Sequence, residues 1–318
     1  MRTFATLSSI VLWFSCAPLC AQIEIARTVI ASSGGTMAAG GVQLDQTLGE
    51  PVSTTVSAQQ VLLNQGFHQN APLRARLNLH AILEGPYKSS NGRMVDSLRS
   101  AGYLPMIEPY TALGFATVGS SGEHTSANVL ATAGDNAVVD WVFVELRDAA
   151  DNVQVVATRS ALLQRDGDVV DVDGSTGVAF SMPLGSYYIC IKHRNHLGVL
   201  TLNAVTLDAV GTPVDLSDAS TATYGTDARK PVGAAQVLWA GDVNGDALLK
   251  YTGLQNDRDP ILVEIGGSVP TTVVQGYSTS DVNMDGRIKY VGAENDRDII
   301  LQNIGGAVPT DTKAAQLP

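Results

Sequence analysis

The sequence has little cysteine, few aromatic residues and few charged side chains. Of 318 residues, 3 are Cys, 6% are aromatic and 16% are charged. A disulfide-rich scaffold is therefore excluded. Hydrophobic residues make up 45% of the chain and only 13 residues are Pro. That balance excludes disorder throughout, and the length allows two or three modest domains with a real core.

The chain also lacks a positive charge balance and any long basic run. It carries 20 Lys+Arg against 31 Asp+Glu, which gives a formal net charge of -11. A field of that sign repels phosphate, so we expect no nucleic-acid partner. The same negative charge attracts cations.

No apolar run approaches the roughly 20 residues that a membrane-spanning helix needs. A short one, residues 10–14, follows Arg2 and precedes small residues that end at Ala21. This pattern predicts a signal peptide over residues 1–21, cleaved after Ala21, and a protein that is secreted or held at the cell surface. A lipid anchor on Cys16 is the alternative. Cleavage after Ala21 leaves only Cys190, which we expect to be a buried, inert thiol.

The order of β-prone runs predicts a mainly β protein. Residues 22–72 indicate a β-rich leader. Residues 73–215 indicate an antiparallel β-sandwich, because short β-branched runs alternate with Gly, Asp and Asn turns. The expected strands cover residues 76–83, 138–146, 153–163, 178–182, 187–192 and 199–207, with one short helix over 94–101. The run 138–146 is apolar almost throughout and should be central. Residues 216–236 indicate a connector and 311–318 a tail.

The strongest pattern is an internal repeat within residues 237–310. DVNGDALLKYTGLQNDRDPILVEIGGSVPT (residues 242–271) recurs 39 residues later as DVNMDGRIKYVGAENDRDIILQNIGGAVPT, with 19 of 30 positions identical. Each copy places oxygen-bearing side chains at alternate positions of a short loop. These residues are Asp242, Asn244 and Asp246 in the first copy and Asp281, Asn283 and Asp285 in the second.

Alternate spacing lets three side-chain oxygens converge, and calcium takes six to eight oxygen ligands without strict geometry. The spacing matches positions 1, 3 and 5 of an EF-hand loop. Position 7 would add a backbone carbonyl, from Leu248 or Arg287, and position 8 is the apolar Leu249 or Ile288. Position 6 is Gly286 in the second loop but Ala247 in the first. We therefore predict two calcium ions.

The closing acid of an EF-hand is absent, since Gly stands at position 12 in both copies. Acids follow a few residues later, and a larger loop could use them. The candidates are Asp257 and Asp259 in the first copy and Asp296 and Asp298 in the second. A short amphipathic helix follows, so one Asp of each pair could bind metal while the other caps the helix. We favour Asp257 and Asp296 as the ligands. The alternative for the whole set is that these side chains only close Asx turns.

These loops, each followed by an acid-led helix and duplicated, resemble type I dockerin modules. That resemblance implies a small helical module with two calcium ions that docks onto a cohesin partner. The insertions KYTGLQ and KYVGAE depart from it, and Tyr251 and Tyr290 stand near the positions that usually read the partner. Calcium binding therefore transfers better than cohesin docking.

The whole chain also resembles a group of exported bacterial surface proteins labelled haemagglutinin-like. The matching stretches include LDQTLGEPV, VVDWVFVELRD and YICIKHRNHLG, and they span most of residues 42–310. This resemblance implies adhesion without specifying a mechanism.

No motif for a nucleophile, a catalytic metal or a phosphate loop is found in the sequence. We therefore expect a secreted, non-catalytic, calcium-binding surface, adhesion or docking protein, with a protein or glycan partner at the cell surface. The alternative is an accessory protein or enzyme of extracellular polysaccharide breakdown, in which the repeats form a targeting tail.

Overall fold

A computed structural model describes residues 33–39, 42–48, 56–58, 61–63, 74–175 and 177–318. The chain divides into two compact units, Met1–Ala71 and Pro72–Pro318. The predicted signal peptide and its cleavage point at Ala21 lie outside the described residues. The first unit contains two antiparallel hairpins, β1 (Ser33–Ala39) with β2 (Val42–Leu48) and β3 (Val56–Ala58) with β4 (Val61–Leu63).

The second unit is built around one sheet of nine strands. The strands are β5 (Ala75–His80), β8 (Val138–Asp148), β9 (Val155–Gln164), β10 (Asp168–Val170), β11 (Val178–Phe180), β12 (Gly185–Lys192), β13 (Val199–Leu200), β14 (Val205–Leu207) and β15 (Thr212–Asp215). Their order is β11-β5-β10-β9-β8-β12-β13, with β14 also on β12 and β15 also on β5. Every pair is antiparallel except β15 with β5. A mainly β fold with a large antiparallel sheet is therefore confirmed.

The sandwich prediction needs correction, because the strands join in one hydrogen-bonded sheet and not in two. β5 connects strands that a sandwich would divide between two sheets. It pairs with β10 and β11 in antiparallel fashion and with β15 in parallel. Beyond β14, Asp208 bridges to Arg76 of β5. Since β14 also pairs with β12, this bridge brings the two ends of the sheet together.

The apolar run 138–146 is the central strand, as its composition predicts. The first ten of the eleven residues of β8 are buried, and β8 pairs with β9 on one side and β12 on the other. Trp141 is fully buried and donates its indole N–H to the carbonyl of Pro105. Cys190 on β12 is buried too, and burial raises the pKa of its thiol to about 12, as expected for an inert cysteine.

Short elements surround the sheet. They are β6 (Tyr87–Lys88), β7 (Arg93–Met94), α1 (Ser97–Ser100), α2 (Ala127–Leu130), β16 (Lys230–Val232) and β17 (Ala235–Val237). The helix expected over residues 94–101 is therefore present but shorter. Among the described residues, no helix is long and apolar enough to cross a membrane.

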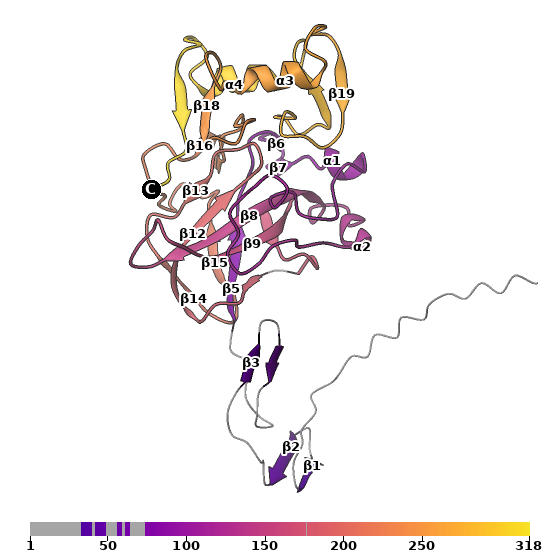
Figure 1. Cartoon of the computed structure of the whole chain (residues 1–318), viewed down its shortest axis with the longest axis vertical. Helices are drawn as coiled ribbons and strands as arrows, with labels where there is room; N and C mark the ends of the chain where they lie inside the picture. Colours follow the sequence, from indigo (N-terminus) through magenta and orange to yellow (C-terminus); the bar gives the residue numbers. More distant parts are fainter. Residues whose placement is uncertain (1–32, 40–41, 49–55, 59–60, 64–73, 176) are drawn as a thin grey trace, which may run out of the picture. The chain divides into compact units, whose positions relative to one another are not determined.

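The repeats form two loop–strand–helix units at one end of the second unit (Figure 1). The first contains β18 (Leu248–Lys250) and α3 (Arg258–Glu264), and the second β20 (Arg287–Lys289) and α4 (Asp296–Asn303). A further strand follows each helix, β19 (Val273–Gln275) after α3 and β21 (Thr312–Ala314) after α4.

The strands after the helices pair reciprocally. β19 leaves the first repeat and pairs with β20 of the second, whereas β21 leaves the second repeat and pairs with β18 of the first. Figure 1 shows the two helices between these two hairpins. The last residues continue to the sheet, where Gln316 bridges Val199 of β13. Residues 311–318 are therefore an ordered strap and not only a tail.

Candidate calcium-binding loops

The first aspartate of each loop is buried and folds the loop back on itself. Asp242 is 7% exposed and accepts a hydrogen bond from the amide of Ala247 at 3.1 Å. Asp281 is fully buried and accepts from the amides of Asp285 at 3.1 Å and Gly286 at 2.8 Å. The other oxygen of Asp242, Oδ1, is buried without a hydrogen-bond partner. A buried carboxylate oxygen without a donor is costly, and a cation would satisfy it.

A second aspartate is buried beside each of these. Asp257 accepts hydrogen bonds from the amides of Val243 (2.8 Å), Asn244 (3.3 Å) and Lys250 (2.8 Å). Asp296 does the same with the amides of Val282, Asn283 and Lys289. Both are fully buried. Three amides hold each carboxylate against the start of the loop and leave part of its acceptor capacity free.

Burial dominates the electrostatics of these four aspartates, and only at Asp281 does a nearby cation, Arg194, act against it. Burial raises the pKa of Asp242 and of Asp281 to about 6. Burial raises the pKa of Asp257 to about 7, with a smaller contribution from Asp242. Burial, helped by the charge of Asp281, raises the pKa of Asp296 to about 8. A bound cation would offset both the desolvation and the repulsion within each pair.

The remaining loop side chains close local turns. Asn244 Oδ1 accepts from the amide of Asp246 at 2.9 Å, and Asp246 accepts from Leu248 at 3.0 Å. The second loop repeats this pattern with Asn283, Asp285 and Arg287. The Asx-turn alternative thus describes these side chains. It does not account for the buried aspartate pairs, which lie outside those turns.

Asp259 and Asp298 differ from their neighbours. Their side chains are 53% and 46% exposed and pair with Arg258 and Arg297. Asn256 and Asn295 make the capping hydrogen bond that we expected of Asp259, since their side chains accept from the amides of Asp259 and Asp298. Asn295 is the N-cap of α4, whereas Asn256 stands one residue before the N-cap of α3. Burial separates the two acids of each pair and leaves Asp257 and Asp296 as the acids beside the loop.

The remaining predicted positions lie in the strands and packing contacts of each repeat. Leu248 and Arg287, the candidate carbonyl donors, begin β18 and β20. The apolar anchors that follow them, Leu249 and Ile288, are buried. Tyr251 lies under the guanidinium of Arg258 at 5.2 Å from the ring centre, and Tyr290 repeats this contact with Arg297 at 5.0 Å. The recurring tyrosines are therefore explained by packing within each repeat.

The segment after β12, to which the sequence assigned no role in the loops, holds both loops to the sheet. Asn195 follows β12 and is fully buried. Its carbonyl accepts from the amides of Gly241 and Asp242, at the start of the first loop. Its side chain donates to the carbonyls of Thr279 (3.0 Å) and Asp281 (2.8 Å), at the start of the second. One residue thus positions both loops, and no motif indicated this.

Arg194, the residue before Asn195, makes additional contacts with the segment that leads into the second loop. Arg194 donates to Asp140 of β8 and to the carbonyl of Ser278, and it lies over the ring of Tyr277 at 4.4 Å. The hydroxyl of Tyr277 donates to Asp140 at 2.7 Å. Burial alone would raise the pKa of Asp140, but Arg194, His193 and Tyr277 outweigh it and lower the pKa to about 2. This buried network extends from the central strand to the second loop.

Comparison with known proteins does not assign the chain. No family model, no curated protein and no solved structure matches it significantly.

Across the described range, no three His, Cys, Asp or Glu side chains converge closely enough to hold a metal unaided. Calcium in these loops would therefore need amide and carbonyl oxygens as well, which are ligands that it accepts. Asp242, Asp257 and Asn244 would hold it in the first loop, and Asp281, Asp296 and Asn283 in the second. The partnerless Asp242 Oδ1 and the raised aspartate pKa values fit that ion.

Proposed function

We propose that this chain is a secreted, non-catalytic, calcium-binding surface protein. Its tandem repeats bind two calcium ions, and the ions order an interaction module that serves adhesion or docking to a protein or glycan partner. The likeness of the repeats to type I dockerin modules supports this proposal, and so does the likeness of the chain to exported haemagglutinin-like proteins.

The observation that carries the proposal is the duplicated pair of buried aspartates. Asp242 with Asp257, and Asp281 with Asp296, lie in equivalent places 39 residues apart. Among the ion pairs of the described residues, none involves these four carboxylates. Burying two carboxylates together without a cation is unfavourable, so their retention in both copies indicates a cation-binding role.

The module needs the ions for stability as well. Its own core consists of few buried side chains: Ala240, Val243, Ile261, Ile265, Val282, Ile288 and Ile300. A ligand present at 100 times its Kd adds roughly 2.7 kcal/mol per site if the unfolded chain does not bind it. Two such contributions are large beside so small a core. Calcium outside the cell would therefore hold the module in its ordered form.

A second candidate is an accessory role in extracellular polysaccharide breakdown, with the repeats as a targeting tail. The dockerin resemblance favours it, since dockerins attach secreted proteins to larger assemblies. Pull-down of cohesin-type partners in calcium, together with a hydrolase panel on the full chain, separates it from the first.

Calorimetric calcium titration of the chelator-treated full mature chain tests the proposal. The full chain is needed because the loops share hydrogen bonds with Asn195 and with the sheet. We expect two bound ions per chain and a higher unfolding temperature in calcium. No heat of binding at millimolar calcium would refute the proposal.

Matched variants show where the ions bind. Asp257→Asn and Asp296→Asn should each abolish one site, because they remove a buried charge beside the loop. Asp259→Asn and Asp298→Asn are the controls and should leave two sites, since these side chains are half-exposed and pair with arginines. The opposite result would reassign the ligands to Asp259 and Asp298.

A further inference from the structure

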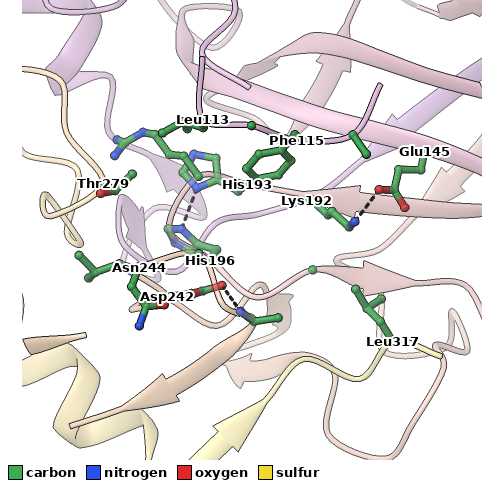
Figure 2. Close-up of a pocket in the computed structure, with 17 residues that line it drawn as sticks. Leu113, Phe115, Glu145, Lys192, His193, His196, Asp242, Asn244, Thr279 and Leu317 are labelled. Carbon is green, nitrogen blue, oxygen red and sulfur yellow. Dashed lines mark hydrogen bonds and ion pairs between the residues drawn. The ribbon is translucent and has the colours of Figure 1, made fainter. Parts of the chain in front are cut away.

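A pocket opens beside the first loop. It has a volume of about 490 Å³, and both the sheet and the loop line it (Figure 2). Asp242, Asn244, Gly245 and Ala247 contribute the loop side. Asp242 lines the pocket although it is more than nine-tenths buried, and its Oδ1 has no hydrogen-bond partner. A pocket of this size suits a ligand as large as one or two sugar rings.

The two loops differ by one residue at this point. Met284 stands where the first loop has Gly245, and it is 1% exposed within the main hydrophobic core. A Cβ added at Gly245 would meet nothing within 4 Å. The side chain that closes the second loop against the sheet is thus absent from the first, and a calcium ion in the first loop would face the pocket.

The opposite wall carries a lysine that shares its carboxylate partner with a second cation behind it. Lys192 donates to Glu145 Oε1 at 2.5 Å, while Arg147 binds Glu145 Oε2 at 2.8 Å. One buried carboxylate therefore serves two cations. The Lys192 side chain remains 29% exposed and lines the pocket. Phe115 and Leu113 supply apolar lining, and Figure 2 shows Phe115 beside Lys192.

The histidines of the pocket do not offer ligand atoms. His193 bonds Asp140 through Nε2 and His196 through Nδ1. Nε2 of His196 accepts from the amide of Gly85 at 3.2 Å. Burial lowers the pKa of both rings, so they stay neutral. The groups of this pocket that can contact a ligand are therefore Lys192, the ring of Phe115 and the first loop.

We propose that this pocket binds an acidic sugar, a uronate unit of a polysaccharide, and that calcium in the first loop takes part. The sugar carboxylate pairs with Lys192, its ring packs against Phe115, and its hydroxyl oxygens complete the coordination of the ion. Calcium accepts such oxygens readily, and a charge-assisted hydrogen bond to a carboxylate is stronger than a neutral one. This inference rests on the proposed calcium function and names the class of its partner.

The uronate proposal is tested by calorimetric titration of the calcium-saturated full chain with D-galacturonate and D-glucuronate. D-galactose, which lacks the carboxylate, and acetate, which lacks the sugar ring, are the control ligands. We expect the uronates to bind, and the neutral sugar and acetate to bind at least tenfold more weakly. Chelator should abolish the uronate signal. Lys192→Met should weaken uronate binding roughly tenfold, since it removes one charged hydrogen bond. Glu145 keeps Arg147 in that variant, so the fold is retained.

The control variant is Lys88→Met, since Lys88 lines a pocket beside the second loop. It should leave uronate binding unchanged. Calcium stoichiometry is measured first on the same sample, so that the two proposals fail separately. Two bound ions without uronate binding overturn the sugar site alone. Uronate binding that is equal in chelator, or equal to that of galactose, also overturns it. Absence of calcium binding overturns both.

Discussion

The two loops have nearly the same sequence but different surroundings. The second is fixed to the sheet by Met284 in the main core, and by Tyr277 through Asp140. The first is held at its start by the carbonyl of Asn195 and faces a pocket. Nearly the same loop sequence therefore packs into the main core in one copy and borders the sheet pocket in the other.

The largest expected difference between the loops follows from alanine substitution at their fourth position. Met284→Ala should lower the free energy of unfolding of the Pro72–Pro318 unit by about 2–5 kcal/mol, because it leaves a cavity in the core. Gly245→Ala should cost only about 1–2 kcal/mol, the penalty of a positive φ for a residue with a Cβ. Urea denaturation in calcium measures both. Equal losses would show that the second loop is not anchored by its methionine.

Acid should release the second loop through Asp140. The pKa of Asp140 is about 2 in the folded protein, below the 3.8 that is usual for an aspartate. A depressed carboxylate pKa stabilises the fold above the unfolded value, and this contribution is lost as pH falls through the folded value. We expect about 2 kcal/mol to disappear between roughly pH 5 and pH 2.

Asp140→Asn should remove that part of the acid dependence, whereas Asp151→Asn, in an exposed turn, should not. Denaturation curves across this pH range decide the matter. An unchanged slope in Asp140→Asn would mean that other groups govern acid unfolding.

The smallest effect is expected at the sixth loop position, with opposite signs in the two copies. Ala247 has φ 65°, so Ala247→Gly should relieve strain and stabilise by about 0.5–1 kcal/mol. Gly286 has φ +81°, and a Cβ there would lie 3.1 Å from the ring of Tyr103. Gly286→Ala should therefore destabilise by about 1–3 kcal/mol. Thermal unfolding of the two variants tests the signs, and two shifts in the same direction would contradict the comparison.

Local patterns predicted much of this structure. The apolar run over β8 predicted a central strand, since only a strand covered on both faces is apolar at every position. The repeat predicted both loops and their helices from spacing alone. The sandwich prediction was wrong because pairing between distant strands, such as β15 with β5, leaves no local pattern.

The parts that sequence reasoning missed depend on single residues and long-range contacts. Asn195 gave no signal because buried amides that bond to carbonyls have no characteristic spacing. β19 and β21 are three residues long, too short for alternation to be read. The choice between Asp257 and Asp259 depends on burial, which adjacent residues of one type do not reveal. The role of the acids as calcium ligands remains a prediction.

The reciprocal pairing of β19 and β21 also sets the order in which the two loops can be completed as the chain is synthesised. The strands, loop and helix of the second site are contiguous, from residue 273 to 303. The first loop begins at Asp242 but receives its partner strand from residues 312–314. A chain that emerges N-terminus first can thus close its second site before its first. A nascent chain that has reached residue 303 can hold the second loop, whereas the first loop waits for residues 312–314.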